Sequence, residues 1–190
     1  EALTNDPRWV YGIPPAKPAH FAWLQHALYH MSSKGQAGIV MPNGTLTTSQ
    51  GGEDIIRKRM IEDDVVECII ALPGQLFLNT QIPCCLWFFA KDKTKNGRGR
   101  CGETLFIDAR KMGYLKDRVN RAFTQEDIQK IAQTVHLWRE DEDHFAVTES
   151  QEKQVYGDIP GFCKSASIKE IKENGFVLSP GRYCGSEEVE

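Results

Sequence analysis

Two almost uninterrupted apolar runs lie near the middle of the chain, "VVECIIAL" at residues 65–72 and "CCLWFFA" at residues 84–90. A strand with one face in water alternates between apolar and polar residues, whereas a strand covered on both faces is apolar throughout. Both runs are therefore expected to be strands in the interior of a sheet. The fold must supply other elements that pack on each face of that sheet.

An irregular loop of about eleven residues, 73–83, connects these two runs. Parallel strands need a longer crossover, usually a helix, whereas antiparallel strands can be joined directly. The run at 84–90 is therefore expected to be antiparallel to the run at 65–72. An earlier apolar run at 37–42 is separated from 65–72 by a helical segment over 53–62, which favours parallel pairing between these two. This order of elements predicts an α/β fold.

The remaining segments are predicted from apolar spacing and from helix-capping residues. Thr124 followed by Asp127, and Ser167 followed by Glu170, are both patterns typical of a helix N-terminus. The expected elements are a loop over 1–19, a helix from His20 to about Gly35, a strand over 103–109, a helix over 124–139 and a short helix that ends at Asn174-Gly175.

Composition limits the class of protein. The chain has 190 residues, of which 41% are hydrophobic, enough for one domain with a substantial core. The formal net charge of −3 argues against a globally basic nucleic-acid binder but leaves local basic patches open. Six cysteines without a C-x-x-C pair suit buried thiols in a reducing cytoplasm, and no metal site is expected. The sequence contains no membrane-length apolar run and does not open with a signal peptide, so a cytoplasmic protein with no membrane contact is expected.

One glycine pattern resembles a nucleotide-binding loop. Gly97, Gly99 and Gly102 spell G-x-G-x-x-G after a predicted strand. A dinucleotide site also needs a helix to begin at the third glycine, because the helix N-terminus binds the phosphates. The segment 103–109 is strand-like instead, so a flexible connection is expected there. The hypothesis that the chain is part of a nucleotide-dependent reductase rests on this glycine pattern alone.

Seven segments, taken together and in order, resemble one family. It is the modification (M) subunit of type I restriction-modification systems, a DNA methyltransferase that acts on N6 of adenine. The segments are "DPRWVYGIPP" (6–15), "FAWLQHAL" (21–28), "AGIVMPNG" (37–44), "ALPGQLFLNTQIPCCLWFFAK" (71–91), "LFIDAR" (105–110), "IPGFCK" (159–164) and "LSPGRY" (178–183).

This resemblance implies the downstream part of a Rossmann-like class I methyltransferase sheet, with three core strands of which the last is antiparallel and lies between the other two. Residues 1–112 would complete the catalytic domain, and residues 113–190 would form an α-rich C-terminal region that contacts DNA or another subunit. In the family, the S-adenosylmethionine loop and the catalytic Asn-Pro-Pro-Phe motif lie upstream of the "DPRW" segment. Neither is found in these 190 residues. The parent protein is therefore expected to bind S-adenosylmethionine, and this chain alone to be inactive, with no catalytic or cofactor-binding residue of its own.

The resemblance also suggests a role for Phe77. An enzyme that methylates adenine must rotate the nucleotide out of the duplex, and an aromatic ring can then stack on the extruded base. Related amino-methyltransferases place such an aromatic residue in the loop between the last two strands, where Phe77 lies. In the alternative, Phe77 anchors the loop in the core while Leu76 or Leu78 is exposed.

Basic residues are candidates for contacts with DNA phosphates, which position a duplex without reading its sequence. A solvated surface loop is the alternative. The candidates in the first basic loop are Lys91, Lys93, Lys95, Arg98 and Arg100, and further basic residues follow at Arg110, Lys111, Lys116, Arg118 and Arg121.

The partners implied by the resemblance are double-stranded DNA and the specificity (S) and restriction (R) subunits of the same system. Without its upstream neighbour, the strand at 37–42 would expose an edge, so self-association is also expected. A second hypothesis is a non-catalytic module that docks a specificity subunit. Its surface would be the helix 124–139, the acidic run that follows this helix, and the segment 159–171.

Overall fold

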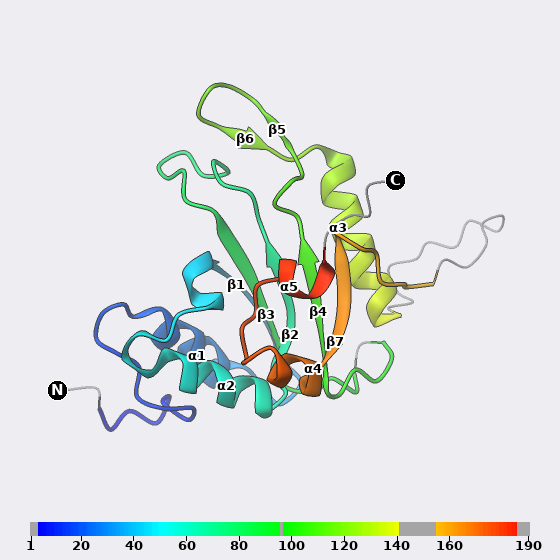
Figure 1. The fold of residues 1–190 in the computed structure, drawn as a ribbon. Coiled ribbons are helices and arrows are strands. Elements are labelled where there is room, and N and C mark those ends of the chain that lie inside the picture. The colour runs from blue at the N-terminus through cyan, green and yellow to red at the C-terminus, as the bar shows by residue number, and fades with distance from the viewer. Residues whose placement is uncertain (1–3, 96, 141–154, 186–190) are drawn as a thin grey trace.

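The computed structural model describes residues 4–95, 97–140 and 155–185, and its centre is a five-stranded sheet (Figure 1). The strands, in their order across the sheet, are β1 (Gln36–Pro42), β3 (Cys84–Ala90), β2 (Val66–Ala71), β4 (Glu103–Asp108) and β7 (Cys163–Ser167). Strand β3 is antiparallel to both β1 and β2, and β2 is parallel to β4. The prediction that the run at 84–90 is antiparallel and lies between the other two strands is confirmed.

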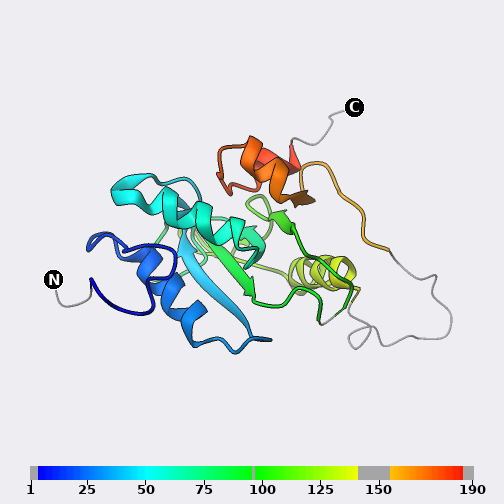
Figure 2. The same ribbon diagram turned by 90° about the horizontal axis from the view of Figure 1, so that it is seen from below.

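Helices cover both faces of this sheet, as Figures 1 and 2 show. On one face, α1 (His20–His30) and α2 (Glu53–Glu62) pack with α4 (Ile168–Glu173) and α5 (Gly181–Cys184). On the other face lies α3 (Gln125–Arg139). Two short 3-10 helices, η1 (Asn43–Leu46) and η2 (Gln50–Gly52), lie between β1 and α2, and a small ribbon of β5 (Tyr114–Leu115) and β6 (Arg121–Ala122) lies between β4 and α3.

Each face of the sheet has its own hydrophobic cluster. Along β4, Phe106 belongs to the cluster under α1 and α2, whereas Leu105 and Ile107 belong to the cluster under α3. Because successive strand residues point to opposite faces, a strand that is buried on both faces is expected to be apolar at nearly every position. All six residues of β2 are buried, which explains the apolar run at 65–72, and its one charged residue, Glu67, is buried in ion pairs with two arginines.

The capping patterns mark helix starts as expected. The backbone N–H of Asp127 donates to Thr124 Oγ1 at 3.1 Å, and the N–H of Thr124 donates to Asp127 Oδ2 at 2.9 Å, so the capping box is present. The N–H of Glu170 donates to Ser167 Oγ at 3.2 Å in the same way. Helix α1, however, ends at His30, because Met31 is extended, and Gly35 closes a separate turn instead.

The C-terminal region contains more strand than the sequence predicts. Strand β7 pairs antiparallel with β4, and Ala166 and Ile171 join the main core, so this segment completes the sheet instead of forming a helical unit. Only two of the five residues of "CKSAS" are buried, because β7 is an edge strand, and an apolar run is therefore missing. The acidic run 141–144 lies outside the described residues.

All six cysteines are free thiols, and five of them are buried. The burial predicted for Cys68, Cys84 and Cys85 is confirmed. Within the described residues, every helix is too short or too polar to cross a membrane.

Candidate nucleic-acid interface

The loop 73–83 extends from the carboxyl end of β2 (Figure 1). Gln75 adopts a positive φ of 68°, and the N–H of Thr80 donates to the carbonyl of Phe77, which forms a tight turn. The side chain of Phe77 is 44% exposed, whereas Leu76 packs against the cluster under α3. The structure therefore does not support Phe77 as the residue that anchors this loop in the core, because Leu76 has that position.

The basic loop that follows β3 is mostly structural. Lys93 is 3% exposed, and its Nζ lies 2.5 Å from Asp64 Oδ1 and donates to the carbonyls of Val66 and Glu103. Burial lowers the pKa of Lys93, and the nearby Asp64 opposes that shift. Because the ammonium group of Lys93 is buried and donates to these three groups, it is not available to a DNA phosphate at the surface.

Arg100 is fully buried. Its Nη2 donates to Glu67 Oε1 at 3.0 Å, and Nη2 of Arg139 lies 2.5 Å from Glu67 Oε2. Glu67 on β2 therefore lies between two guanidinium groups, one from the basic loop and one from the end of α3. The ion pair with Glu67 compensates the charge of the buried Arg100. Because Arg100 does not reach the surface, it is not a ligand for a DNA phosphate.

The other three basic residues of the loop differ in exposure. Arg98 is paired with Glu103 at 2.7 Å and lies over the ring of Trp138. The pKa of Arg98 is raised by its hydrogen bond to Glu103. Lys91 is exposed and donates to the carbonyl of Met31, and Lys95 is exposed. Only Lys91 and Lys95 therefore keep a charge that an approaching phosphate could reach without breaking a side-chain ion pair.

The two candidate sites lie at opposite ends of the sheet (Figure 1). Loop 73–83 leads into β3, and the basic loop begins where β3 ends. A strand rises about 3.3 Å per residue, so the seven residues of β3 separate the two loops by roughly 20 Å. The structure therefore does not bring Phe77 and the 91–100 loop into one site.

A small cavity of about 300 Å³ lies at the same end of the sheet as Phe77. Its polar lining includes Asn43, Arg110 and Arg182, none of which is among the five candidates of the first basic loop. The side chain of Arg110 donates two hydrogen bonds to Asp108, from Nε at 2.8 Å and from Nη2 at 2.6 Å. Burial alone would raise the pKa of Asp108, but the hydrogen bonds from Arg110 outweigh it and hold the pKa below its ordinary value.

All of residues 1–190 match the family model described as N-6 DNA Methylase. The chain is 50% identical over its whole length to the Type I restriction enzyme HindI methylase subunit of Haemophilus influenzae, of which it covers 39%. It is 37% identical over 186 residues to the Type I restriction enzyme MjaIX methylase subunit of Methanocaldococcus jannaschii, with 95% of this chain and 31% of that protein covered. The chain belongs to the N-6 DNA methylase family.

Solved structures agree with this assignment. The methyltransferase subunit of a type I restriction-modification system from Streptococcus thermophilus superposes with a TM-score of 0.76 at 30% identity, covering 97% of this chain and 34% of that one. The M protein of the type I restriction enzyme EcoKI superposes with a TM-score of 0.64 at 15% identity, over 96% of this chain and 40% of that one, a likeness of fold alone. The chain thus spans two fifths or less of the proteins that it matches.

Proposed function

We propose that this chain is the downstream part of the catalytic subunit of a type I restriction-modification system. The complete subunit would transfer a methyl group from S-adenosylmethionine to N6 of adenine in double-stranded DNA. The match of all 190 residues to the N-6 DNA methylase family carries this proposal. The strand order β1-β3-β2, with β3 antiparallel, also supports the proposal, because these strands would form the end of a doubly wound, Rossmann-like sheet.

Two features beside β1 support a larger sheet in the complete subunit. Among the described strands, β1 has a single neighbour, and its Val40 is 51% exposed. An apolar hollow of about 550 Å³ lies between α3 and strands β1 and β3, with Phe88 and Ile131 in its lining. A free strand edge next to apolar surface is the arrangement expected where further strands and helices of the same subunit pack.

The donor and catalytic groups are assigned to the upstream part of the subunit. Pro14 and Pro15 follow Ile13, so this pair lacks the Asn and the aromatic residue of a catalytic Asn-Pro-Pro-Phe. The 190-residue chain alone is therefore expected neither to bind S-adenosylmethionine nor to methylate DNA. A specificity subunit would select the target, and a restriction subunit would complete the system.

Calorimetry and methyl transfer test this function. We expect the complete subunit, in its natural complex, to bind S-adenosylmethionine and to transfer labelled methyl groups to adenine in duplex DNA. The 190-residue chain should give no heat of binding with the same compound. Binding of S-adenosylmethionine by the chain alone would contradict the assignment of the donor site to the upstream part of the subunit. A complete complex that leaves adenine unmethylated would contradict the proposed function.

Within this function, we propose that the ring of Phe77 stacks on the face of the extruded adenine. The exposed phenyl ring in a loop at the carboxyl end of β2 supports this role, because ligands of open α/β sheets bind at the carboxyl ends of the strands. Lys91 and Lys95 remain candidates for phosphate contacts, but only at the other end of the sheet.

The docking hypothesis concerns the surface of α3 and the segment 159–171. Ile159, next to β7, is 47% exposed, whereas Ile128 on α3 lines the apolar hollow beside β1. We assign the contact with a specificity subunit to the segment 159–171, as a second role of the same chain.

The free edge of β1 leads to a prediction for the isolated chain. We expect it to self-associate, because unpaired backbone groups on an edge strand can pair with a second copy. Val40→Lys, which puts a charge on this edge, should weaken the association about tenfold. The matched control is Ile55→Lys on α2, since Ile55 is also 51% exposed. Sedimentation velocity over a wide concentration range measures both, and a monomer throughout would contradict the prediction.

A further inference from the structure

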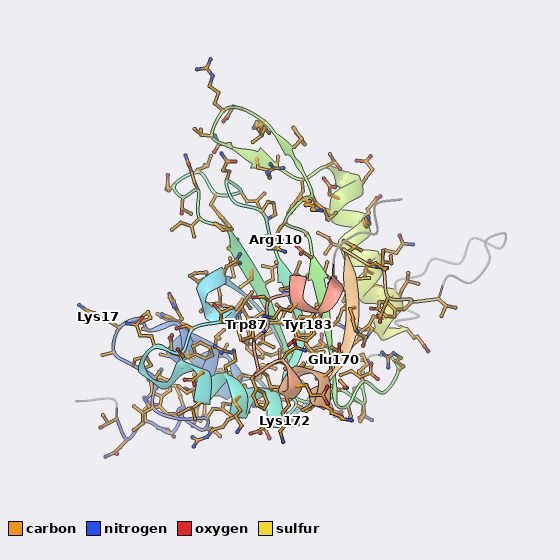
Figure 3. All side chains as sticks on the ribbon, viewed as in Figure 1. Lys17, Trp87, Arg110, Glu170, Lys172 and Tyr183 are labelled. Atoms are coloured by element: carbon orange, nitrogen blue, oxygen red, sulfur yellow. The ribbon has the colours of Figure 1, made fainter. Side chains whose placement is uncertain are left out.

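Strands β1, β2 and β4 run in one direction, because β1 and β2 are both antiparallel to β3 and β4 is parallel to β2. Their carboxyl ends are Pro42, Ala71 and Asp108, and the cavity of about 300 Å³ lies at these ends. Segments from "MPNG", "ALPG", "LFIDAR" and "LSPGRY", which are far apart in the sequence, therefore meet around one cavity. Figure 3 shows Arg110 between α5 and the upper end of the sheet.

The segment 179–182 is held on the sheet by aromatic packing. The ring of Tyr183 stacks on Phe106 of β4 with centroids 3.9 Å apart and 10° between the planes. Tyr183 Oη also donates to the carbonyl of Val177. Because Arg182 directly precedes this anchored residue, its backbone position beside the cavity is set by the core.

Glycine at 181 makes room for Arg110. A Cβ atom at this position would lie 2.6 Å from Arg110 Nη2. A side chain there would therefore displace the guanidinium from its present position in the lining of the cavity. The clash involves only the end of a flexible side chain, so the fold itself does not depend on this glycine.

The lining of the cavity includes hydrogen-bond donors that have no partner within the described residues. Among the described residues, the side chain of Arg182 makes no hydrogen bond or ion pair, and Nη1 of Arg110 has no partner. Asn43 Oδ1 is buried without a hydrogen-bond partner, and rotation of that amide would present its N–H₂ group instead. Asp108 is already paired with the guanidinium of Arg110 through two side-chain hydrogen bonds, so Arg182 leaves a net positive charge at the cavity.

We propose that this cavity binds a phosphate group of the DNA backbone, with Arg182 and Arg110 as its charged ligands and the Asn43 amide as a further donor. The planar fork of a guanidinium matches the geometry of phosphate oxygens. The cavity and Phe77 lie at the same end of the sheet, so the phosphate would belong to the strand that carries the extruded nucleotide. This inference rests on the proposed function.

DNA binding by the complete subunit in its natural complex tests the site. Arg182→Ala should weaken the affinity for duplex DNA about three- to tenfold and reduce the slope of log K against log salt by about one. The matched control is Lys172→Ala, which removes the same charge from an exposed residue of α4 at the other end of the sheet (Figure 3). The control should leave both quantities unchanged.

Gly181→Ala is the second variant, because it keeps every charge and displaces only Arg110. We expect it to weaken DNA binding in the same direction with an unchanged melting temperature. If both Arg182→Ala and Gly181→Ala bind DNA like the wild type, the proposed phosphate site is excluded, even where adenine methylation is intact. Failure of the wild-type complex to methylate adenine would instead overturn the proposed function.

Inorganic phosphate separates two sources of the ligand. Competition by phosphate against DNA in the wild type, and its reduction in Arg182→Ala, would support a backbone phosphate at this site. If Arg182→Ala loses phosphate binding but keeps its DNA affinity and salt slope, the cavity holds a small free anion, and the assignment to DNA is overturned.

Discussion

Replacing Glu67 by alanine should destabilise the folded protein by about 3–5 kcal/mol, because removing one partner of a buried ion pair leaves the other charge without compensation. Arg100 is fully buried and makes two hydrogen bonds to Glu67 Oε1. Arg139 would lose its carboxylate as well, which would loosen the end of α3. Urea denaturation, followed by tryptophan fluorescence, would measure the loss.

The control for Glu67 is an ion pair on the surface. Lys58 and Glu62 lie 3.8 Å apart on α2, with side chains about half exposed. Lys58→Ala should change the stability by less than about 0.5 kcal/mol, since water and salt screen such pairs. A loss for Glu67→Ala as small as this would mean that Arg100 reaches water, contrary to its burial.

Replacing Phe77 by alanine in the complete subunit should weaken binding of an extrahelical adenine by about 1–3 kcal/mol, or roughly five- to 150-fold. The ring is 44% exposed, so its loss should cost the fold less than about 1 kcal/mol. Duplexes with a fluorescent adenine analogue at the target position would report the binding directly.

Two further variants identify the cause of that loss. Phe77→Trp keeps an aromatic face and should retain most of the affinity, whereas Phe77→Leu should not. Ile55→Ala truncates a residue of similar exposure on α2 and should have no effect. Unchanged affinity and methylation rate in Phe77→Ala would exclude the stacking role.

The central sheet could be predicted because its determinants are local. The apolar runs at 65–72 and 84–90 show burial on both faces, and the short connection between them specifies antiparallel pairing. Strand β7 could not be predicted in this way. It is an edge strand with polar residues, and its place beside β4 depends on packing between segments about sixty residues apart.

The candidate site was predicted less well than the fold. Phe77 lies in an exposed loop, as the family resemblance led us to expect for a base-binding residue, although its role is still a proposal. Lys93 and Arg100 appeared as surface charges in a basic loop, but both are buried. The sequence shows how many charges a loop carries, and it does not show that Asp64 and Glu67, more than twenty-five residues earlier, neutralise them.

The sequence by itself therefore determined the order and character of the main strands and helices, because apolar periodicity and helix caps act over a few neighbouring residues. The tertiary structure alone decided which charges remain at the surface, and that Asn43, Arg110 and Arg182 share a cavity. The physical reason is that electrostatic and cavity-forming contacts join residues that are distant in the chain, and only the packed sheet brings them within a few ångströms of one another.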